Sequence, residues 1–105
     1  MADTLNIYLN DIVSNLKANY SPEKIILFGS YSDGTYTEDS DIDLLLIKET
    51  NKHPIWRRVE ARKASKAVIP IDILVYTADE IKQILTDKSS FLIDVIKNGK
   101  ILYER

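Results

Sequence analysis

Cysteine is absent from the sequence, and no apolar run in it is long enough to cross a membrane. The first absence excludes disulfides, thiolate metal sites and cysteine nucleophiles, and it fits a reducing compartment. The second excludes a spanning helix, which needs about 18 consecutive apolar residues. The first residues, M-A-D-T-L-N, also lack the basic and then apolar blocks of a signal peptide. We therefore expect a cytoplasmic protein with no membrane association.

An excess of positive charge is missing as well. The 105 residues carry a formal net charge of −2 and have a pI near 5.3, whereas domains that bind nucleic-acid backbones are usually basic. Direct nucleic-acid binding is therefore not expected. Hydrophobic residues make up 45% and charged residues 29% of the chain, as in ordinary globular domains. Two separate cores would be too small at this length, so residues 1–105 should form one domain.

The hydrophobic pattern predicts helices and strands in the order α-β-β-α-β-α-α-β, an α/β sandwich. The predicted helices cover residues 4–19, 54–67, 78–86 and 91–98, and the predicted strands cover residues 24–28, 41–48, 71–76 and 101–103. Residues 29–40 should form a loop or a single helical turn. The strand at 41–48 is apolar on both faces, which predicts a central position in a sheet that is covered on both sides.

Polar residues, proline and glycine mark the helix ends. Ser21-Pro22 should end the first helix. Thr77 should cap the helix that begins at residue 78, and Ser89 or Ser90 should cap the next one. Gly99 should then end that helix in the left-handed C-cap conformation.

The helix at 54–67 should have one apolar and one basic side. Ile55, Val59 and Ala67 are predicted on the first side. The other side carries Arg57, Arg58, Arg62, Lys63 and Lys66. Such a basic side is most often a solvated surface, and contact with nucleotide phosphates or an acidic partner is the alternative. His53, the single histidine, stands beside a proline at the helix start and is interpreted as a surface residue.

Three aspartates give the strongest indication of chemistry. Asp41 and Asp43 open the strand at 41–48, and residues two apart on a strand point to the same side. Asp72 lies between two isoleucines of the next strand, and it can face the same point if the two strands are neighbours. Like charges about 4 Å apart repel by roughly 4 kcal/mol at an effective dielectric near 20. A divalent cation would relieve this repulsion, which favours a metal site at the three residues.

The turn at Gly29 and Ser30 lies between a buried strand and the acidic strand. Glycine allows a ligand to approach the backbone closely, and the serine supplies a donor and an acceptor. Phosphate contact is therefore indicated, although a simple tight turn is the alternative for the pair alone. The corresponding alternatives for Asp41 and Asp43 are a turn cap and an ion pair with a basic residue. All these residues together favour a divalent cation that carries a polyphosphate.

This pattern resembles the DNA polymerase β-like nucleotidyltransferases, and within them the small branch called minimal nucleotidyltransferases. The resemblance rests on Gly29-Ser30 with Gly34, then Asp41-Ile42-Asp43-Leu44, then Asp72, in this order. It covers residues 24–76 well. It implies a small mixed β-sheet flanked by helices. It also implies transfer of a nucleoside monophosphate, AMP from ATP, to an acceptor hydroxyl with the help of two Mg²⁺ ions, for which Mn²⁺ can substitute.

The resemblance also implies a role for each residue. Asp41 and Asp43 would hold the metals that grip the triphosphate. Asp72 would bind the metal that lowers the pKa of the acceptor hydroxyl, and would help to take its proton. Gly29 and Ser30 would hold the outer phosphates while pyrophosphate leaves.

Two departures from the family pattern concern binding. Many small relatives carry basic residues where this chain has Tyr31 and Asp33, and an added acid there would weaken triphosphate binding. The chain also ends soon after the predicted sheet, so we expect the acceptor-binding surface to come from elsewhere.

The minimal branch is commonly encoded beside an all-helical HEPN-type RNase toxin, and its members act as antitoxins that adenylylate a tyrosine of that partner. The resemblance therefore implies a HEPN-type partner. Two other functions are alternatives: a non-catalytic module that neutralises a partner by contact, and a nucleotidyltransferase for small molecules. The sequence leaves open the acceptor, the base and whether the chain forms an oligomer.

Overall fold

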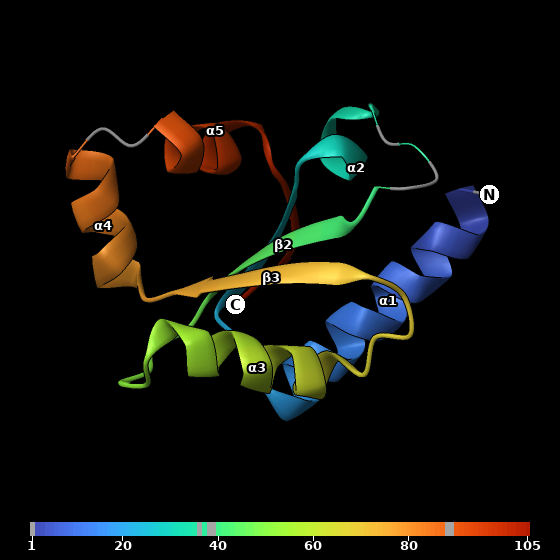
Figure 1. The fold of residues 1–105 in the computed structure, drawn as a ribbon, viewed down its shortest axis with the longest axis horizontal. Coiled ribbons are helices and arrows are strands. Elements are labelled where there is room, and N and C mark those ends of the chain that lie inside the picture. Colours follow the sequence, from blue (N-terminus) through green and yellow to red (C-terminus); the bar gives the residue numbers. More distant parts are fainter. Residues whose placement is uncertain (1, 36, 38–39, 88–89) are drawn as a thin grey trace.

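The computed structural model describes residues 2–35, 37, 40–87 and 90–105. Along them the elements are α1 (Ala2–Asn19), β1 (Lys24–Phe28), α2 (Ser30–Asp33), β2 (Ile42–Ile47), α3 (Pro54–Ser65), β3 (Ile71–Tyr76), α4 (Ala78–Thr86), α5 (Ser90–Asn98) and β4 (Lys100–Glu104) (Figure 1). The predicted order is confirmed, and α2 is the single helical turn expected between the first two strands. No helix within the described ranges is long and apolar enough to cross a membrane.

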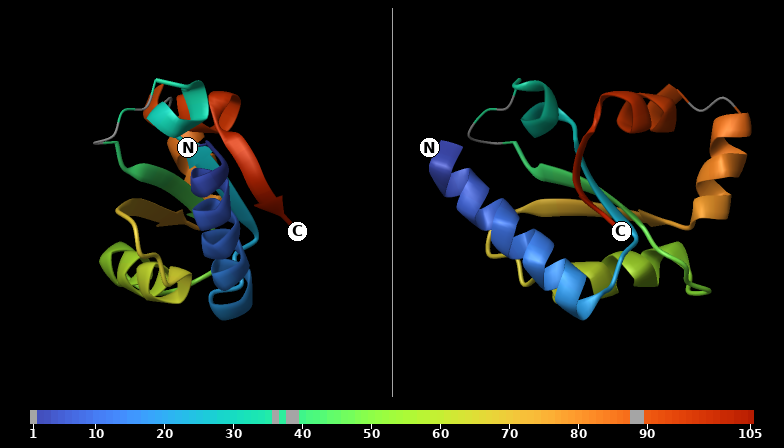
Figure 2. Two further views of the ribbon diagram at one scale, coloured as in Figure 1. Left: turned by 90° about the vertical axis from the view of Figure 1, so that its right-hand side faces the viewer. Right: turned by 180° about the vertical axis from the view of Figure 1, so that it is seen from behind.

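The four strands form one mixed sheet in the order β3-β2-β1-β4. The central strand β2 runs parallel to β3 and antiparallel to β1, and β1 is also antiparallel to β4. Helices α1 and α3 cover one face of the sheet, and α4 and α5 lie on the other (Figure 2). The predicted central position of the second strand and the expected mixed sheet flanked by helices are therefore confirmed.

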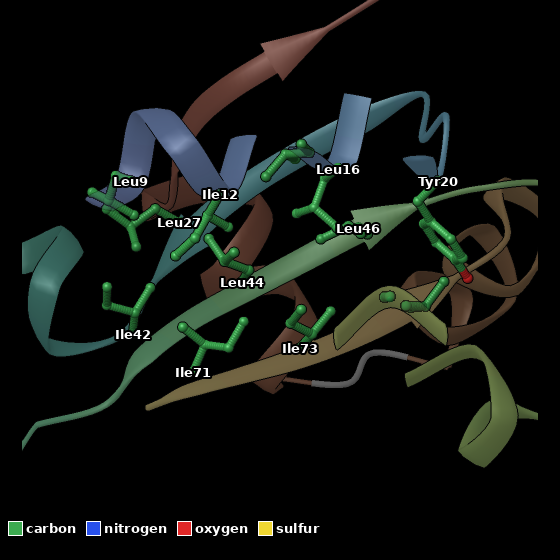
Figure 3. Close-up of a cluster of buried hydrophobic side chains, with 13 residues drawn as sticks. Leu9, Ile12, Leu16, Tyr20, Leu27, Ile42, Leu44, Leu46, Ile71 and Ile73 are labelled. Atoms are coloured by element: carbon green, nitrogen blue, oxygen red, sulfur yellow. The ribbon is translucent and has the colours of Figure 1, made fainter. Parts of the chain in front are cut away.

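Side chains of β2 alternate between two hydrophobic clusters. Leu44 and Leu46 point to the face under α1 and α3, whereas Leu45 points to the face under α5, and all three are fully buried. Burying one leucine contributes roughly 1.5–3 kcal/mol. The larger cluster also contains Leu9, Ile12, Leu16, Tyr20, Ile25, Leu27, Ile42, Ala61, Ile71, Ile73 and Val75 (Figure 3).

The predicted sides of α3 are wrong for Arg57, Ile55 and Val59, whereas Arg58, Arg62, Lys63 and Lys66 are exposed as expected. Arg57, which was expected on a solvated side, is only 5% exposed and forms an ion pair with Glu80, with 2.6 Å between Nη1 and Oε1. Ile55 and Val59, which were expected on the apolar side of the helix, are 63% and 38% exposed. The helix instead turns Ala61 into the core.

The physical reason for this reversal lies at the outer edge of β3, which among the described residues pairs with β2 alone. Three guanidinium groups of α3 donate hydrogen bonds to alternate carbonyl oxygens along this edge. The bonds run from Arg62 to Ile71 at 3.3 Å, from Arg58 to Ile73 at 3.0 Å and from Arg57 to Val75 at 3.4 Å. An open sheet edge leaves backbone groups that need such partners. These edge arginines (Arg57, Arg58 and Arg62) therefore close the edge of the sheet.

The prediction for Gly99 is also wrong. Gly99 lacks the left-handed backbone, which among the described glycines occurs at Gly29 and Gly34. A Cβ at Gly99 would lie 2.6 Å from Cγ2 of Ile26 and would collide with the carbonyl oxygen of Val95. The position needs glycine because α5 ends directly against β1, so close packing and not backbone conformation excludes a side chain.

Other helix ends follow the prediction more closely. Thr77 caps α4: its hydroxyl accepts a hydrogen bond from the Glu80 N–H at 3.1 Å, and the Glu80 carboxylate accepts one from the Thr77 N–H at 2.8 Å. This reciprocal capping box satisfies two backbone donors. Ser90 is the first residue of α5, and Ser89 lies outside the described residues. His53 is exposed, as expected, and its Nδ1 caps the start of α3.

Candidate active site

One end of the sheet brings Gly29, Asp43 and Asp72 into a row across three neighbouring strands. Phe28, the last residue of β1, pairs with Asp43 of β2, and Asp43 is in register with Asp72 of β3. Gly29 directly follows Phe28. The sequence predicted that both aspartates meet only if the second and third strands are neighbours, and the sheet order meets this condition.

Gly29 has a backbone that only glycine adopts readily, with φ 77° and ψ −154°. A Cβ added there would lie 2.5 Å from Oδ2 of Asp43, so the backbone of the turn touches the carboxylate. Helix α2 begins at the next residue, Ser30, where backbone N–H groups have no partner inside the helix. The turn thus places backbone donors beside an acidic side chain.

The carboxylate of Asp43 is affected by its burial and by both of the other aspartates. Burial raises its pKa above the ordinary value, and the negative charges of Asp72 and Asp41 raise that pKa further. Asp41 lies just before β2 and is exposed, whereas Asp43 is partly buried. Asp41 and Asp72 are therefore both close enough to repel Asp43, and a bound cation relieves repulsion of this kind.

Asp72 forms an ion pair with an arginine of the same chain. Its Oδ1 lies 2.7 Å from Nη2 of Arg58, and the two side chains are 48% and 50% exposed. In the described part of the chain no three histidine, cysteine, aspartate or glutamate side chains are arranged to hold an ion. The oxygen donors present still fit Mg²⁺ or Mn²⁺ chemically. An ion shared with Asp43 would compete with Arg58 for the charge of Asp72.

Tyr31 has a structural role that the sequence did not indicate. Its hydroxyl donates a hydrogen bond to the carbonyl oxygen of Ser40 at 3.3 Å, and its ring packs against the larger core cluster. The bond fixes the backbone immediately before Asp41. The sequence feature that could have indicated this role is the presence of an aromatic residue within a polar loop. The side chain of Asp33, which was expected to weaken triphosphate binding, lies outside the described residues.

A groove of about 260 Å³ lies next to this site, between α3 and β3. Its lining residues are Ile55, Arg58, Val59, Arg62, Ile71, Asp72 and Ile73. Asp72 thus belongs both to the row of acidic residues and to the wall of the groove. The groove could not be predicted from the sequence, because Ile55 and Val59 fit the apolar side of an ordinary amphipathic helix.

Residues 9–103 match the model of the nucleotidyltransferase domain family, and the chain belongs to that family. A candidate protein adenylyltransferase of Methanocaldococcus jannaschii is 30% identical over 99 residues, which span 90% of this chain and 94% of the relative. A second candidate protein adenylyltransferase of the same organism is 28% identical and is matched over 96% of this chain and 73% of its own length.

Solved structures agree with the family. A candidate nucleotidyltransferase from Sulfolobus solfataricus superposes with a TM-score of 0.63 over 93% of this chain and 78% of its own, and at 20% identity this likeness concerns the fold. A chain of a toxin-antitoxin structure with AMP-PNP superposes with a TM-score of 0.61 at 29% identity, over 91% of this chain and 73% of its own.

Proposed function

We propose that this nucleotidyltransferase transfers AMP from ATP to a tyrosine hydroxyl of an all-helical HEPN-type toxin, and that it acts as the antitoxin of that partner. The observation that carries the proposal is the row of Gly29, Asp43 and Asp72 at one end of the sheet. The names of the archaeal relatives support adenylyl transfer to protein. The likeness to a chain of a toxin-antitoxin structure with AMP-PNP, an ATP analogue, supports the substrate and the kind of partner.

The triphosphate belongs on the side of Asp41 and Asp43. These two carboxylates would hold the metal ions, and the backbone N–H groups and hydroxyl at Gly29-Ser30 would contact the outer phosphates. The raised pKa of Asp43 fits a position where positive charge is required. When bound, two Mg²⁺ ions would neutralise the phosphates and lower the pKa of the attacking hydroxyl.

The acceptor belongs on the side of Asp72. This residue lies on the edge strand β3 and lines the groove, whereas Asp43 lies on the central strand. The hydroxyl oxygen forms a bond to the α-phosphorus, the bond from that phosphorus to the bridging oxygen of the β-phosphate breaks, and pyrophosphate leaves. Asp72 would help to hold the hydroxyl and take up its proton.

Co-expression with an all-helical HEPN-type protein, sought in the adjacent reading frames, tests this function. We expect the partner to gain one AMP on a tyrosine, as mapped by mass spectrometry of its peptides, and to lose its RNase activity. Partner that is co-expressed with Asp43→Asn should stay unmodified and toxic. If the wild type and Asp43→Asn both neutralised the partner without modifying it, the protein would instead be a contact inhibitor. Modification of nucleosides or aminoglycosides, with none on protein, would identify a small-molecule enzyme.

A further inference from the structure

The groove between α3 and β3 combines apolar walls with positive charge beside Asp72. Ile55 and Val59 are 63% and 38% exposed there, and Trp56 on the same helix is 62% exposed. Clustered exposed apolar residues mark interaction surfaces, and tryptophan is often a major contributor to binding. At about 260 Å³ the groove is smaller than the roughly 300–1,000 Å³ of typical small-molecule pockets. Its size therefore suits one or two side chains of a protein.

The charge of the groove favours an acidic segment. Arg62 is exposed and donates a hydrogen bond to the carbonyl oxygen of Ile71 at 3.3 Å. It forms no ion pair with a carboxylate within the residues that the structure describes. A guanidinium group has five N–H donors, so this residue can also donate hydrogen bonds to a carboxylate of a partner.

The edge arginines also limit how a partner can bind. They already occupy the outer carbonyl oxygens of Ile71, Ile73 and Val75. A segment that added itself to the sheet as a further strand would have to displace them. A bound chain is therefore expected to lie over the guanidinium groups and to place its side chains in the groove.

We propose that this groove is the docking subsite of the protein acceptor, and that it takes a tyrosine segment with a large apolar neighbour and a flanking carboxylate. The proposal rests on the proposed function, because Asp72 is the residue assigned there to the acceptor hydroxyl. A tyrosine that reaches Asp72 must bring its neighbouring residues past Val59 and Arg62, which line the same groove. The apolar neighbour then contacts Val59 and Ile55, and the carboxylate meets Arg62.

Two matched peptides test the charge and the position of the site. The probes are acetyl-Glu-Leu-Tyr-Leu-Glu-amide and acetyl-Lys-Leu-Tyr-Leu-Lys-amide, each titrated into the ¹⁵N-labelled full chain and followed by amide chemical shifts. We expect the acidic peptide to shift signals of the groove residues and to bind about tenfold more tightly than the basic one. Equal affinities, shifts confined to other surfaces, or no shift at millimolar peptide would overturn the proposal.

Two substitutions of the same kind provide the control. Val59→Glu introduces a charge into the groove and should abolish binding of the acidic peptide. Val68→Glu makes the same change at a residue that is 81% exposed and does not line the groove, and it should bind as the wild type does. Arg62→Glu should reverse the preference between the two peptides. Unchanged binding to Val59→Glu would contradict the assignment.

A parallel titration with Mg²⁺ and ATP separates this proposal from the proposed function. ATP should shift the amide signals of Gly29, Ser30 and Asp43 in the wild type and in Val59→Glu alike. Absence of these shifts, with intact peptide binding, would refute nucleotide transfer and leave the groove as a peptide-binding site. Normal ATP shifts without peptide binding would refute the groove alone.

Discussion

Asp72 and Arg58 form an ion pair at the outer edge of β3, with 2.7 Å between Oδ1 and Nη2. Arg58 is held there by a second bond, from its Nε to the carbonyl oxygen of Ile73 at 3.0 Å. Both partners are about half exposed, and exposed ion pairs contribute only about 0–1 kcal/mol. The pair therefore neutralises Asp72 without metal and is weak enough for a divalent cation to displace.

Arg58→Gln should raise the affinity for Mn²⁺ two- to fivefold, roughly the 0.4–1 kcal/mol that an exposed pair contributes. The reason is that the cation no longer competes with the guanidinium group for Asp72. Isothermal titration calorimetry measures the change. Lys63→Gln removes the same charge from an exposed position on the same helix and should leave affinity nearly unchanged. Weaker Mn²⁺ binding to Arg58→Gln would show that Arg58 does not compete for the site.

Asp43→Asn should raise the melting temperature of the metal-free protein near neutral pH. Because the pKa of Asp43 is raised in the folded state, folding favours its protonated form, and the charged form costs stability above that pKa. The advantage of the variant should therefore shrink as the pH falls through the raised pKa toward the unfolded value. Thermal unfolding by circular dichroism over this range gives the result.

The exposed Asp11 supplies the control, and Asp11→Asn should not raise the melting temperature. A lower melting temperature for Asp43→Asn near neutral pH would mean that the carboxylate is stabilised by partners and not repelled by its neighbours.

Gly29→Ala should be more harmful than Gly34→Ala, although both positions have positive φ, 77° and 84°. Each replacement places a side chain on a backbone with positive φ, which costs about 1–3 kcal/mol. A Cβ at Gly34 meets no atom within 4 Å, whereas one at Gly29 would lie 2.5 Å from Asp43 Oδ2. Gly29→Ala should therefore lower both the free energy of unfolding measured in urea and the affinity for ATP. Gly34→Ala should leave the affinity for ATP unchanged. Equal effects of the two changes would argue against close contact between the turn and the carboxylate.

Arg57→Ala should destabilise the fold by about 2–3 kcal/mol, because it removes a buried guanidinium and its charge-assisted bond to Glu80. For a chain of this length that corresponds to a fall in melting temperature of roughly 10 °C or more. Lys63→Ala, at an exposed residue of the same helix, should stay within about 0.5 kcal/mol of the wild type. Similar stabilities for the two variants would show that the pair contributes little.

The pairing with Arg57 also predicts a pH dependence. The hydrogen bond from Arg57 is the main cause that lowers the pKa of Glu80 in the folded state. Its stabilising contribution is present above the unfolded pKa and is lost as the pH falls through the folded one. Arg57→Ala should therefore lose less stability than the wild type over that acidic range.

Elements and site residues that depend on local pattern could be predicted from the sequence. The β-branched runs marked β1 and β3 at their observed bounds, and Asp43 lies in β2 as expected, whereas Asp41 lies just before that strand. The capping role of Thr77 followed from its place before a helix. In each case the deciding interactions lie within a few residues of the chain.

Features that depend on the order of strands could not be predicted in the same way. Arg57 and Val59 exchange their expected environments because β3 is an edge strand whose outer carbonyl oxygens need donors. Gly99 is required by the approach of α5 to β1, and no local signal marks that contact. The ion pair of Asp72 with Arg58 has the same origin, since α3 meets β3 only in the folded sheet.

The most direct test uses ATP that is labelled either at the α-phosphate or at the γ-phosphate. Each form is added with Mg²⁺ to the protein and its co-expressed helical partner. The wild type should transfer label from the α-phosphate to the partner and release the γ-phosphate label as pyrophosphate. Asp72→Asn should keep much of the nucleotide affinity but lose transfer by about 100-fold or more. Label from the γ-phosphate on the partner, or α-label transfer that survives in Asp72→Asn, would contradict adenylyl transfer at this site.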